Sequence, residues 1–405
     1  MDAAETVAEL TRFERRGAGT DAERRAALWL AGQLGADGRE AVVEPFWCRP
    51  NWALTHMWHV ALGLAGSLVS VGSPRIGAGM VLVALLSLLA DVLLGVSPGR
   101  RLTLEHASQN VVSPPPEDLD QPGDRRVRLI LTANYDAGRT GLVHRDRPRA
   151  TAARLRALTG GRGPGWLGWL AILLGWLLVT AILRVRGGGG EALAVAQLAS
   201  TVVLVLALAA LLELAGAEYS PGAGDNGTGV AIAIAMAQAL DAAPPRHAAV
   251  ELVLSGAGDG PGIGLTSYLR RHKRAPADTV VLGIAACAAG APRWWCSDGA
   301  LLPLRYFPRL HELCAVLAAE EPQLGARAHR GRGSSPALPA RVARLPAIAI
   351  GCLDERGLVP RSHQPADTPD AVQAAALDHT LELGLLLVDA LDAFLDASAS
   401  AAVEA

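Results

Sequence analysis

Four polar residues of this chain follow segments whose composition predicts buried strands of a sheet. Asn134 and Asp136 come after the apolar run 127–132 in LILTANYDAGRTG, and Asp259 follows the run AAVELVLSGAG. His363 lies in a loop after a further apolar run, LPAIAIGCL. Ligands of α/β sheets bind beyond the carboxyl ends of the strands. We therefore expect these amide, carboxylate and imidazole groups to gather at one edge of the sheet and to bind a ligand there.

The segments that must position these residues alternate between strand and helix patterns. Strands are expected at 40–46, in DTVVLGIAACAAG and in the three runs above, and helices at 21–34, 303–320 and 371–397. Thr20 is placed to cap the helix at 21–34, with Glu23 three positions on. This alternation predicts an α/β fold, with a mostly parallel twisted sheet and helices on both faces.

Four apolar runs interrupt this pattern in two pairs, at 52–73 with 76–96 and at 166–183 with 192–212. About 20 apolar residues cross a bilayer as a helix, so the runs predict two transmembrane helical hairpins. Tryptophans at 52, 58, 166 and 169 suit a membrane interface. The soluble alternative is a set of helices buried in the protein core.

These patterns divide the chain into one interrupted α/β domain and two hairpins. The expected divisions are 1–50, 97–163 and 219–398 for the α/β domain, 52–96 and 166–213 for the hairpins, and 399–405 for a tail. Twelve arginines lie between residues 97 and 163, including Arg125 and Arg126, whereas the hairpin tips hold three. Because positive charge favours the cytoplasmic side, the α/β domain is expected there.

Composition narrows the possible partners. The chain has 405 residues, 51% hydrophobic and 19% charged, with a net charge of −2. One lysine and no basic stripe argue against a nucleic-acid partner. In GAGDGPGIG the glycines fall at every second position, which does not fit a nucleotide-binding loop. The five scattered cysteines indicate free thiols in a reducing compartment, and the charged N-terminus does not resemble a signal peptide. The expected partners are the lipid bilayer and a peptide or protein.

His56 and His59 stand three residues apart in the first apolar run. Polar residues at membrane depth often bind metal or relay protons. Both lie near the expected interface, where an ordinary structural role is the simpler interpretation.

Outside the apolar runs, the chain resembles the co-catalytic zinc aminopeptidase family, peptidase family M28. The resemblance rests on RRGAGTDAERRAALWLAGQL, LTANYDAGRTG, SPGAGDNGTGVAIAIAMAQAL and LVPRSHQPADTPDAV. It implies two zinc ions about 3.5–4 Å apart and a general base that takes a proton from metal-bound water. By this resemblance Asp225 matches the bridging aspartate, His363 the last ligand histidine and Asp136 an aspartate that orients the first histidine.

The departures from the family pattern are equally specific. Asn134 stands where the first metal's histidine is expected, and Ala285 where its aspartate is expected. Gly258 occupies the position of the general base, and Asp259 replaces the second metal's glutamate. The resemblance thus leaves Asp225, Asp259 and His363 as a candidate site for at most one zinc, without a base.

Three functions remain open at this point. The first is a catalytically degenerate family member that binds a peptide, a partner or a single metal. The second is an active single-zinc metallopeptidase acting on peptides near the membrane. The third is a structural or assembly role in which the α/β domain organises the hairpins.

Overall fold

The computed structural model describes residues 2–115 and 127–403 of the chain. Arg125, Arg126 and the last two residues of the expected tail lie outside this part. Within it, nine strands form one sheet in the order β1-β2-β4-β3-β5-β9-β6-β7, with β8 paired to β6. The strands are β1 (Val42–Cys48), β2 (His106–Ser113), β3 (Val127–Asn134), β4 (Ala248–Ser255), β5 (Thr279–Ile284), β6 (Ala291–Asp298), β7 (Leu304–Arg305), β8 (Arg327–Arg330) and β9 (Ala347–Leu353).

The sheet is mixed, so the expectation of a mostly parallel sheet is wrong. Its centre, β4-β3-β5-β9, is parallel throughout. Antiparallel pairs flank this centre: β1 with β2, β2 with β4, β6 with β9 and β6 with β7. The error has a physical cause. The four strands not predicted, β2, β6, β7 and β8, have polar or aromatic sequences without the apolar runs of the central strands.

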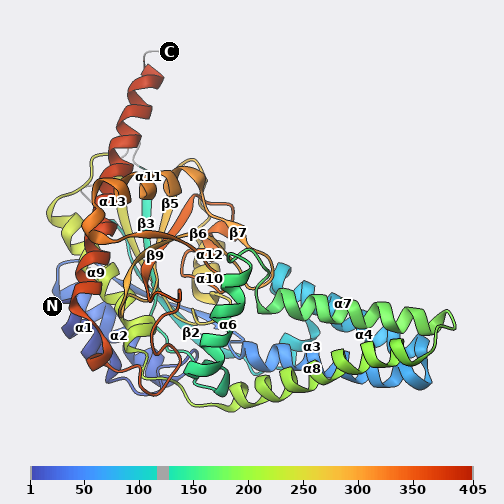
Figure 1. Ribbon diagram of the computed structural model, residues 1–405. Coiled ribbons are helices and arrows are strands. Elements are labelled where there is room, and N and C mark those ends of the chain that lie inside the picture. Colours follow the sequence, from blue (N-terminus) through green and yellow to red (C-terminus); the bar gives the residue numbers. More distant parts are fainter. Residues whose placement is uncertain (1, 116–126, 404–405) are drawn as a thin grey trace.

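Helices cover both faces of the sheet (Figure 1). On one face, a first layer of helices packs against the sheet through one apolar cluster. On the other face, a second layer packs through a second cluster, which includes Leu265, Tyr268 and Ala340. The first layer consists of α1 (Ala3–Thr11), α2 (Asp21–Ala36), α9 (Thr228–Ala242), α11 (Pro308–Glu320) and α13 (Ala374–Val403). The second consists of α10 (Ile263–Arg271) and α12 (Leu338–Val342). The Thr20 hydroxyl accepts from the N–H of Glu23 at 3.2 Å and caps α2, as expected.

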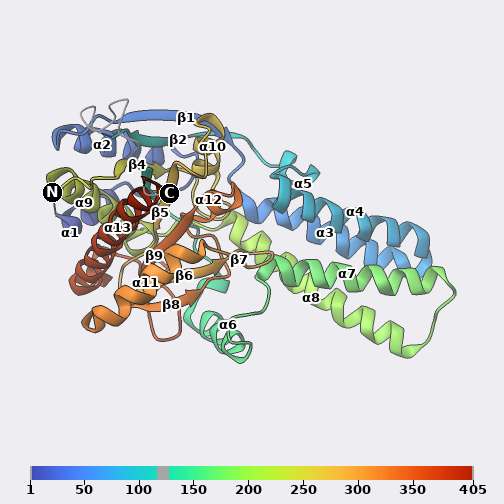
Figure 2. The same cartoon turned by 90° about the horizontal axis from the view of Figure 1, so that it is seen from above.

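The four apolar runs form a four-helix bundle that projects from one side of the α/β domain (Figures 1 and 2). Its helices are α3 (Trp52–Gly72), α4 (Pro74–Leu94), α7 (Trp166–Val185) and α8 (Glu191–Gly216). All four are long and apolar enough to cross a membrane, judged by length and composition. The bundle has its own apolar core, and large side chains such as Leu68 (61%) and Leu206 (65%) stay exposed on its outside. These helices are therefore not buried in the core of the domain.

Small residues let α3 and α4 approach closely. A Cβ added to Gly77 would lie 2.4 Å from the Cα of Ser70. A Cβ on Gly66 would lie 2.8 Å from the Val81 side chain. Gly66 and Ser70 stand four positions apart on α3. Small residues at this spacing are typical of helix contacts in membranes, because association there depends on close packing.

Short elements join the bundle to the domain. They are α5 (Pro98–Arg101) and η2 (Leu142–His144), followed by α6 (Asp146–Leu158). The chain enters the first helical pair between β1 and β2 and the second between α6 and a π-helical turn, η3 (Ala223–Gly227). Both pairs therefore leave the α/β domain and return to it. Two further short turns, η4 (Pro322–Leu324) and η5 (Pro369–Ala371), lie within the domain.

Candidate functional site

The turn that carries Asp225 is built by a buried carboxylate. Asp367 accepts hydrogen bonds from the N–H of Gly224 at 2.7 Å and of Asp225 at 3.1 Å. A Cβ on Gly224 would lie 2.7 Å from an Asp367 oxygen, so glycine is needed for this approach. Burial raises the pKa of Asp367 to about 7, and the charge of Asp225 adds to the effect. The peptide bond between Asp225 and Asn226 is cis.

His363 lies between two carboxylates. Its Nε2 is 3.6 Å from Asp225 Oδ2 and 3.5 Å from Asp259 Oδ1. Its Nδ1 donates to the backbone oxygen of Arg139 at 2.9 Å, which fixes the ring. Burial lowers the pKa of His363, but Asp259 and Asp225 outweigh it, so the pKa lies above its ordinary value. The three residues suggested by the family resemblance thus come together, with 16–20% of each side chain exposed.

Asp136 is placed behind this group of three and holds the loop after β4. Its two oxygens accept from the N–H of Gly258 at 2.9 Å and of Asp259 at 3.0 Å. It therefore orients the backbone that carries Asp259, whereas the resemblance implied that it orients a side chain at position 134. Burial raises its pKa to about 7, and the charge of Asp259 adds to this shift.

Asn134 and Gly258 are in close contact. A Cβ added to Gly258 would lie 2.2 Å from Asn134 Cγ and 2.6 Å from its Cβ. The Asn134 side chain therefore occupies the space that a side chain at position 258 would need. The chain thus accommodates only glycine at position 258 without a shift of its neighbour.

Ala285 is not part of this group. It packs in the apolar cluster that includes Trp295 and Ala349, and its backbone N–H donates to Ile350 at 2.8 Å. The alanine that lies against the Asp225 turn is Ala288, whose Cβ would be 2.7 Å from a Cβ on Gly224. These contacts do not place Ala285 beside Asn134, although the resemblance put both at the ligand positions of the first metal.

Glu23 lies behind the same loop. Its carboxylate accepts from the N–H of Gly19 at 2.7 Å and of Ala257 at 2.8 Å, and from the Ser108 hydroxyl at 2.9 Å. Burial raises its pKa to about 8, and the charge of Asp136 contributes. All its oxygens are used in the protein interior, so Glu23 shapes the loop and does not face a ligand.

Three site residues were missed in the sequence. The Ser362 hydroxyl donates to Asp225 Oδ2, and its position beside His363 could have indicated this contact. The His144 ring stacks on His363 with centroids 4.4 Å apart, and among the described residues its buried Nε2 has no hydrogen-bond partner. Trp52 Nε1 lies 3.5 Å from Asp259 Oδ2. Only the folded chain brings His144 and Trp52 to the site, because both are distant in sequence.

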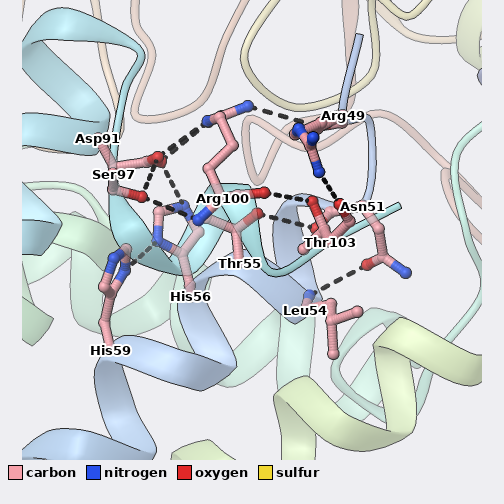
Figure 3. A network of polar contacts seen from close by, with 10 residues as sticks. All are labelled: Arg49, Asn51, Leu54, Thr55, His56, His59, Asp91, Ser97, Arg100 and Thr103. Atoms are coloured by element: carbon pink, nitrogen blue, oxygen red, sulfur yellow. Dashed lines mark hydrogen bonds and ion pairs between the residues drawn. The ribbon is translucent and has the colours of Figure 1, made fainter. Parts of the chain in front are cut away.

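His56 and His59 lie apart from the site, at the base of the bundle (Figure 3). Their Nδ1 atoms are 3.4 Å apart, and both residues are buried. His56 Nε2 is 4.0 Å from a carboxylate oxygen of Asp91. The Arg100 guanidinium donates a hydrogen bond of 2.8 Å to each of the two Asp91 oxygens. The pair is thus part of a polar network that joins α3, α4 and α5.

Asp225, Asp259 and His363 carry the kinds of side chain that bind cations, and they lie around one point of the structure. Carboxylate oxygens and an imidazole nitrogen are ordinary zinc ligands, and a zinc-binding histidine normally donates its other N–H to a carbonyl or carboxylate. Across the described residues, however, no three His, Cys, Asp or Glu side chains stand close enough to hold a metal ion as they are placed. By the family resemblance a second cation would need a histidine at position 134, where this chain has Asn134.

Comparison with known proteins supports the α/β fold of the domain. Residues 214–388 match the sequence profile of peptidase family M28. No curated protein sequence matches the chain. Similar solved structures include BSAP, a zinc aminopeptidase from Bacillus subtilis, at 12% identity and a TM-score of 0.53, covering 95% of this chain and 93% of that one.

Two other similar structures belong to different enzymes. A leucine aminopeptidase precursor from Bacteroides thetaiotaomicron has 12% identity and a TM-score of 0.53. A glutaminyl cyclase from Porphyromonas gingivalis has 12% identity and a TM-score of 0.54. Each alignment covers 96% of both chains. At these identities the similarity establishes a shared fold.

Proposed function

We propose that this protein is a membrane-anchored, metallopeptidase-like protein whose site binds a single zinc ion or a peptide and has lost two-metal peptidase chemistry. The observation that carries the proposal is the position of His363 between Asp225 and Asp259. The fold shared with zinc aminopeptidases and the family match over residues 214–388 support it.

Membrane anchoring is supported by the outer surface of the bundle. Four helices of sufficient length and apolarity stand outside the domain, and their exposed side chains are large and apolar. Such a surface is unfavourable in water and favourable in lipid. Since both helical pairs return to the α/β domain, the whole domain lies on one side of the membrane, and its arginines favour the cytoplasmic side.

Asp225, Asp259 and His363 would hold the zinc ion. A bound zinc ion supplies Lewis acidity that polarises a carbonyl group of a ligand. Asp367 fixes the turn of Asp225, Asp136 fixes the loop of Asp259, and the Arg139 carbonyl fixes the His363 ring. These contacts restrain the three residues that would bind the ion.

A general base is missing from this arrangement. Position 258 is glycine, and its space is filled by Asn134. Glu23 is turned away into three internal hydrogen bonds. General-base catalysis contributes roughly 10²–10⁴-fold to the rate. Without it and without a second cation, we expect peptide hydrolysis to be absent or very slow.

The experiment is zinc analysis of the full chain in detergent, by elemental mass spectrometry after dialysis against zinc and then buffer. We expect about one zinc per chain in the wild type and loss of that zinc in His363→Ala. The matched control is His379→Ala, on α13 away from the site. Two zinc ions per chain together with aminopeptidase turnover would contradict the proposal. Absence of both zinc and peptide binding would favour the structural role instead.

A further inference from the structure

The loop between β6 and β7 rests on the start of α7, one of the four helices long enough to cross a membrane. The N–H of Gly168, in the first turn of α7, donates to the Ala300 carbonyl at 3.1 Å. A Cβ on Gly165 would lie 2.3 Å from the same oxygen, so a side chain there would collide with the loop. Leu302 of this loop is 64% exposed. The loop therefore presents an apolar side chain beside the expected membrane interface, where Trp166 begins α7 (Figure 2).

Three arginines lie next to this loop. Arg305 of β7 and Arg330 of β8 both pair in register with Ser297, which lies between them on β6. Neighbouring strands are about 4.8 Å apart, so the Cα atoms of the two arginines are roughly 10 Å apart. Arg330 Nη1 also donates to the Gly160 carbonyl at 3.1 Å, in the connection between α6 and α7. Arg341 of α12 donates through its Nε to the Arg305 carbonyl. The strands β7 and β8 and the helix α12 thus bring arginines together beside the start of α7.

Two further arginines lie close to Arg330. Arg332 follows β8, and Arg156 lies in the last turn of α6. Burial lowers the pKa of Arg332, and the charges of Arg156 and Arg330 lower it further, so the three guanidinium groups repel one another. Groups of arginines held together in this way are typical of sites that bind phosphate. We call these five residues the arginine group: Arg156, Arg305, Arg330, Arg332 and Arg341.

The arginine group has no acidic partner. Within the described ranges 2–115 and 127–403, none of its members forms an ion pair with a carboxylate. The charge of Asp298 reaches two of the arginines, but this residue is only 1% exposed. Its oxygens accept from the N–H groups of Gly299 and Gly333 at 2.9 Å and of Ser335 at 2.6 Å. The Asp298 carboxylate is therefore bound to the backbone inside the protein, and the outward-facing charge of this surface is positive.

Resting on the proposed membrane anchoring, we infer that the arginine group binds the phosphate of an anionic phospholipid in the leaflet next to the α/β domain. Planar guanidinium groups bind phosphate oxygens through paired hydrogen bonds. The proposed orientation places the domain at the cytoplasmic leaflet, whose anionic lipids attract basic groups. The exposed Leu302 contacts the acyl chains of this lipid. A soluble phosphate or an acidic peptide would use the arginines and leave Leu302 in water.

The test counts the lipids bound to the full chain by native mass spectrometry. The chain is purified in a non-ionic detergent that contains equal amounts of phosphatidylglycerol and phosphatidylcholine with the same acyl chains. The test variant carries Arg330→Gln together with Arg332→Gln. The matched control carries Arg246→Gln together with Lys273→Gln, which removes two exposed positive charges near the starts of β4 and β5. Zinc content and resistance of the membrane-bound chain to alkaline carbonate are measured on the same proteins.

We expect the wild type and the matched control to retain phosphatidylglycerol in preference to phosphatidylcholine. Each arginine at an anionic membrane surface strengthens binding by roughly fivefold, so the double variant should retain phosphatidylglycerol at least about tenfold more weakly. Arg156→Gln, on a different element, should weaken this retention by roughly fivefold and keeps the test decisive if the double variant unfolds. Leu302→Ser should also weaken it, and every variant should keep the zinc content of the wild type.

Equal retention of phosphatidylglycerol by the wild type and a folded arginine variant would overturn the inference. The proposed function would then stand, provided that zinc content and carbonate resistance are unchanged. Inorganic phosphate or a hexaglutamate peptide that displaces the lipid as well as added phosphatidylglycerol does would show that the ligand is a soluble anion. Release of the wild-type chain from membranes by carbonate would instead contradict the membrane anchoring on which the inference rests.

Discussion

The contact between Asn134 and Gly258 bears on the proposed loss of two-metal chemistry. A side chain at position 258 would collide with the Cβ of Asn134, which a rotamer change cannot move. Restoring a glutamate there by itself is therefore unfavourable. The collision involves a Cβ that any residue other than glycine at position 134 would have, so the glycine at 258 is required by the backbone approach of the β4 loop to β3.

Gly258→Glu should destabilise the protein without producing peptidase activity. Overpacking of this kind lowers the free energy of unfolding by about 1–3 kcal/mol. The measurement is thermal unfolding of the detergent-solubilised chain together with an aminopeptidase assay. Gly32→Glu is the control, because a Cβ there meets nothing within 4 Å. Unchanged stability combined with new turnover would show that the steric explanation is wrong.

The raised pKa of Glu23 predicts that the stability of the protein depends on pH. Its folded pKa of about 8 lies above the ordinary value of 4.5. The stability associated with its protonated form is therefore complete below about pH 4.5 and is lost as the pH rises through 8. Because glutamine does not titrate, the Tm of Glu23→Gln relative to wild type should rise by several degrees between about pH 5 and pH 8. A Tm difference that stays constant between these pH values would show that the pKa of Glu23 is not raised. The exposed Glu320→Gln variant is the control, and its Tm difference from wild type is expected to stay constant.

How far the sequence predicts this site can be judged residue by residue. Asp225, Asp259 and His363 could be assigned to one site from the sequence alone, because their short motifs resemble a known family. The roles of His144, Trp52 and Glu23 could not. Their contacts depend on how the bundle and α2 pack against the β4 loop, and a local pattern does not encode that packing.

At the level of elements, the apolar runs predicted all four long apolar helices of the bundle within a few residues. The central parallel strands were predictable for a similar reason: each is rich in apolar residues and largely buried. β2 and β6 were missed because HASQNVVS and APRWWCSD mix polar, aromatic and proline residues. Their pairing is decided by neighbouring strands, which sequence periodicity does not reveal.

The close packing of α3 against α4 depends on Gly77. Gly77→Leu would place its side chain into the Ser70 backbone and should separate the two helices. We expect a loss of about 1–3 kcal/mol of unfolding free energy, as for overpacked cores, seen as earlier thermal unfolding or faster trypsin cleavage in detergent. Gly79→Leu, two residues away, meets nothing within 4 Å and is the matched control. Equal behaviour of the two variants would contradict this packing.

For the whole molecule, the return of both helical pairs to one domain makes a clear topological prediction. The 219–398 region should be protected in right-side-out vesicles and cleaved by added protease in inverted vesicles. The short tip at residues 186–190 should show the opposite accessibility. Cleavage of the 219–398 region only from outside would reverse the proposed orientation.

The central claim is that this fold keeps a place for one cation and not for two. X-ray absorption at the zinc edge, on the full chain loaded with excess zinc and then dialysed, tests it most directly. The account predicts one zinc per chain with a single imidazole and oxygen ligands, and no scattering from a neighbouring metal. A metal–metal distance of about 3.5–4 Å, typical of two-metal hydrolytic sites, would contradict it.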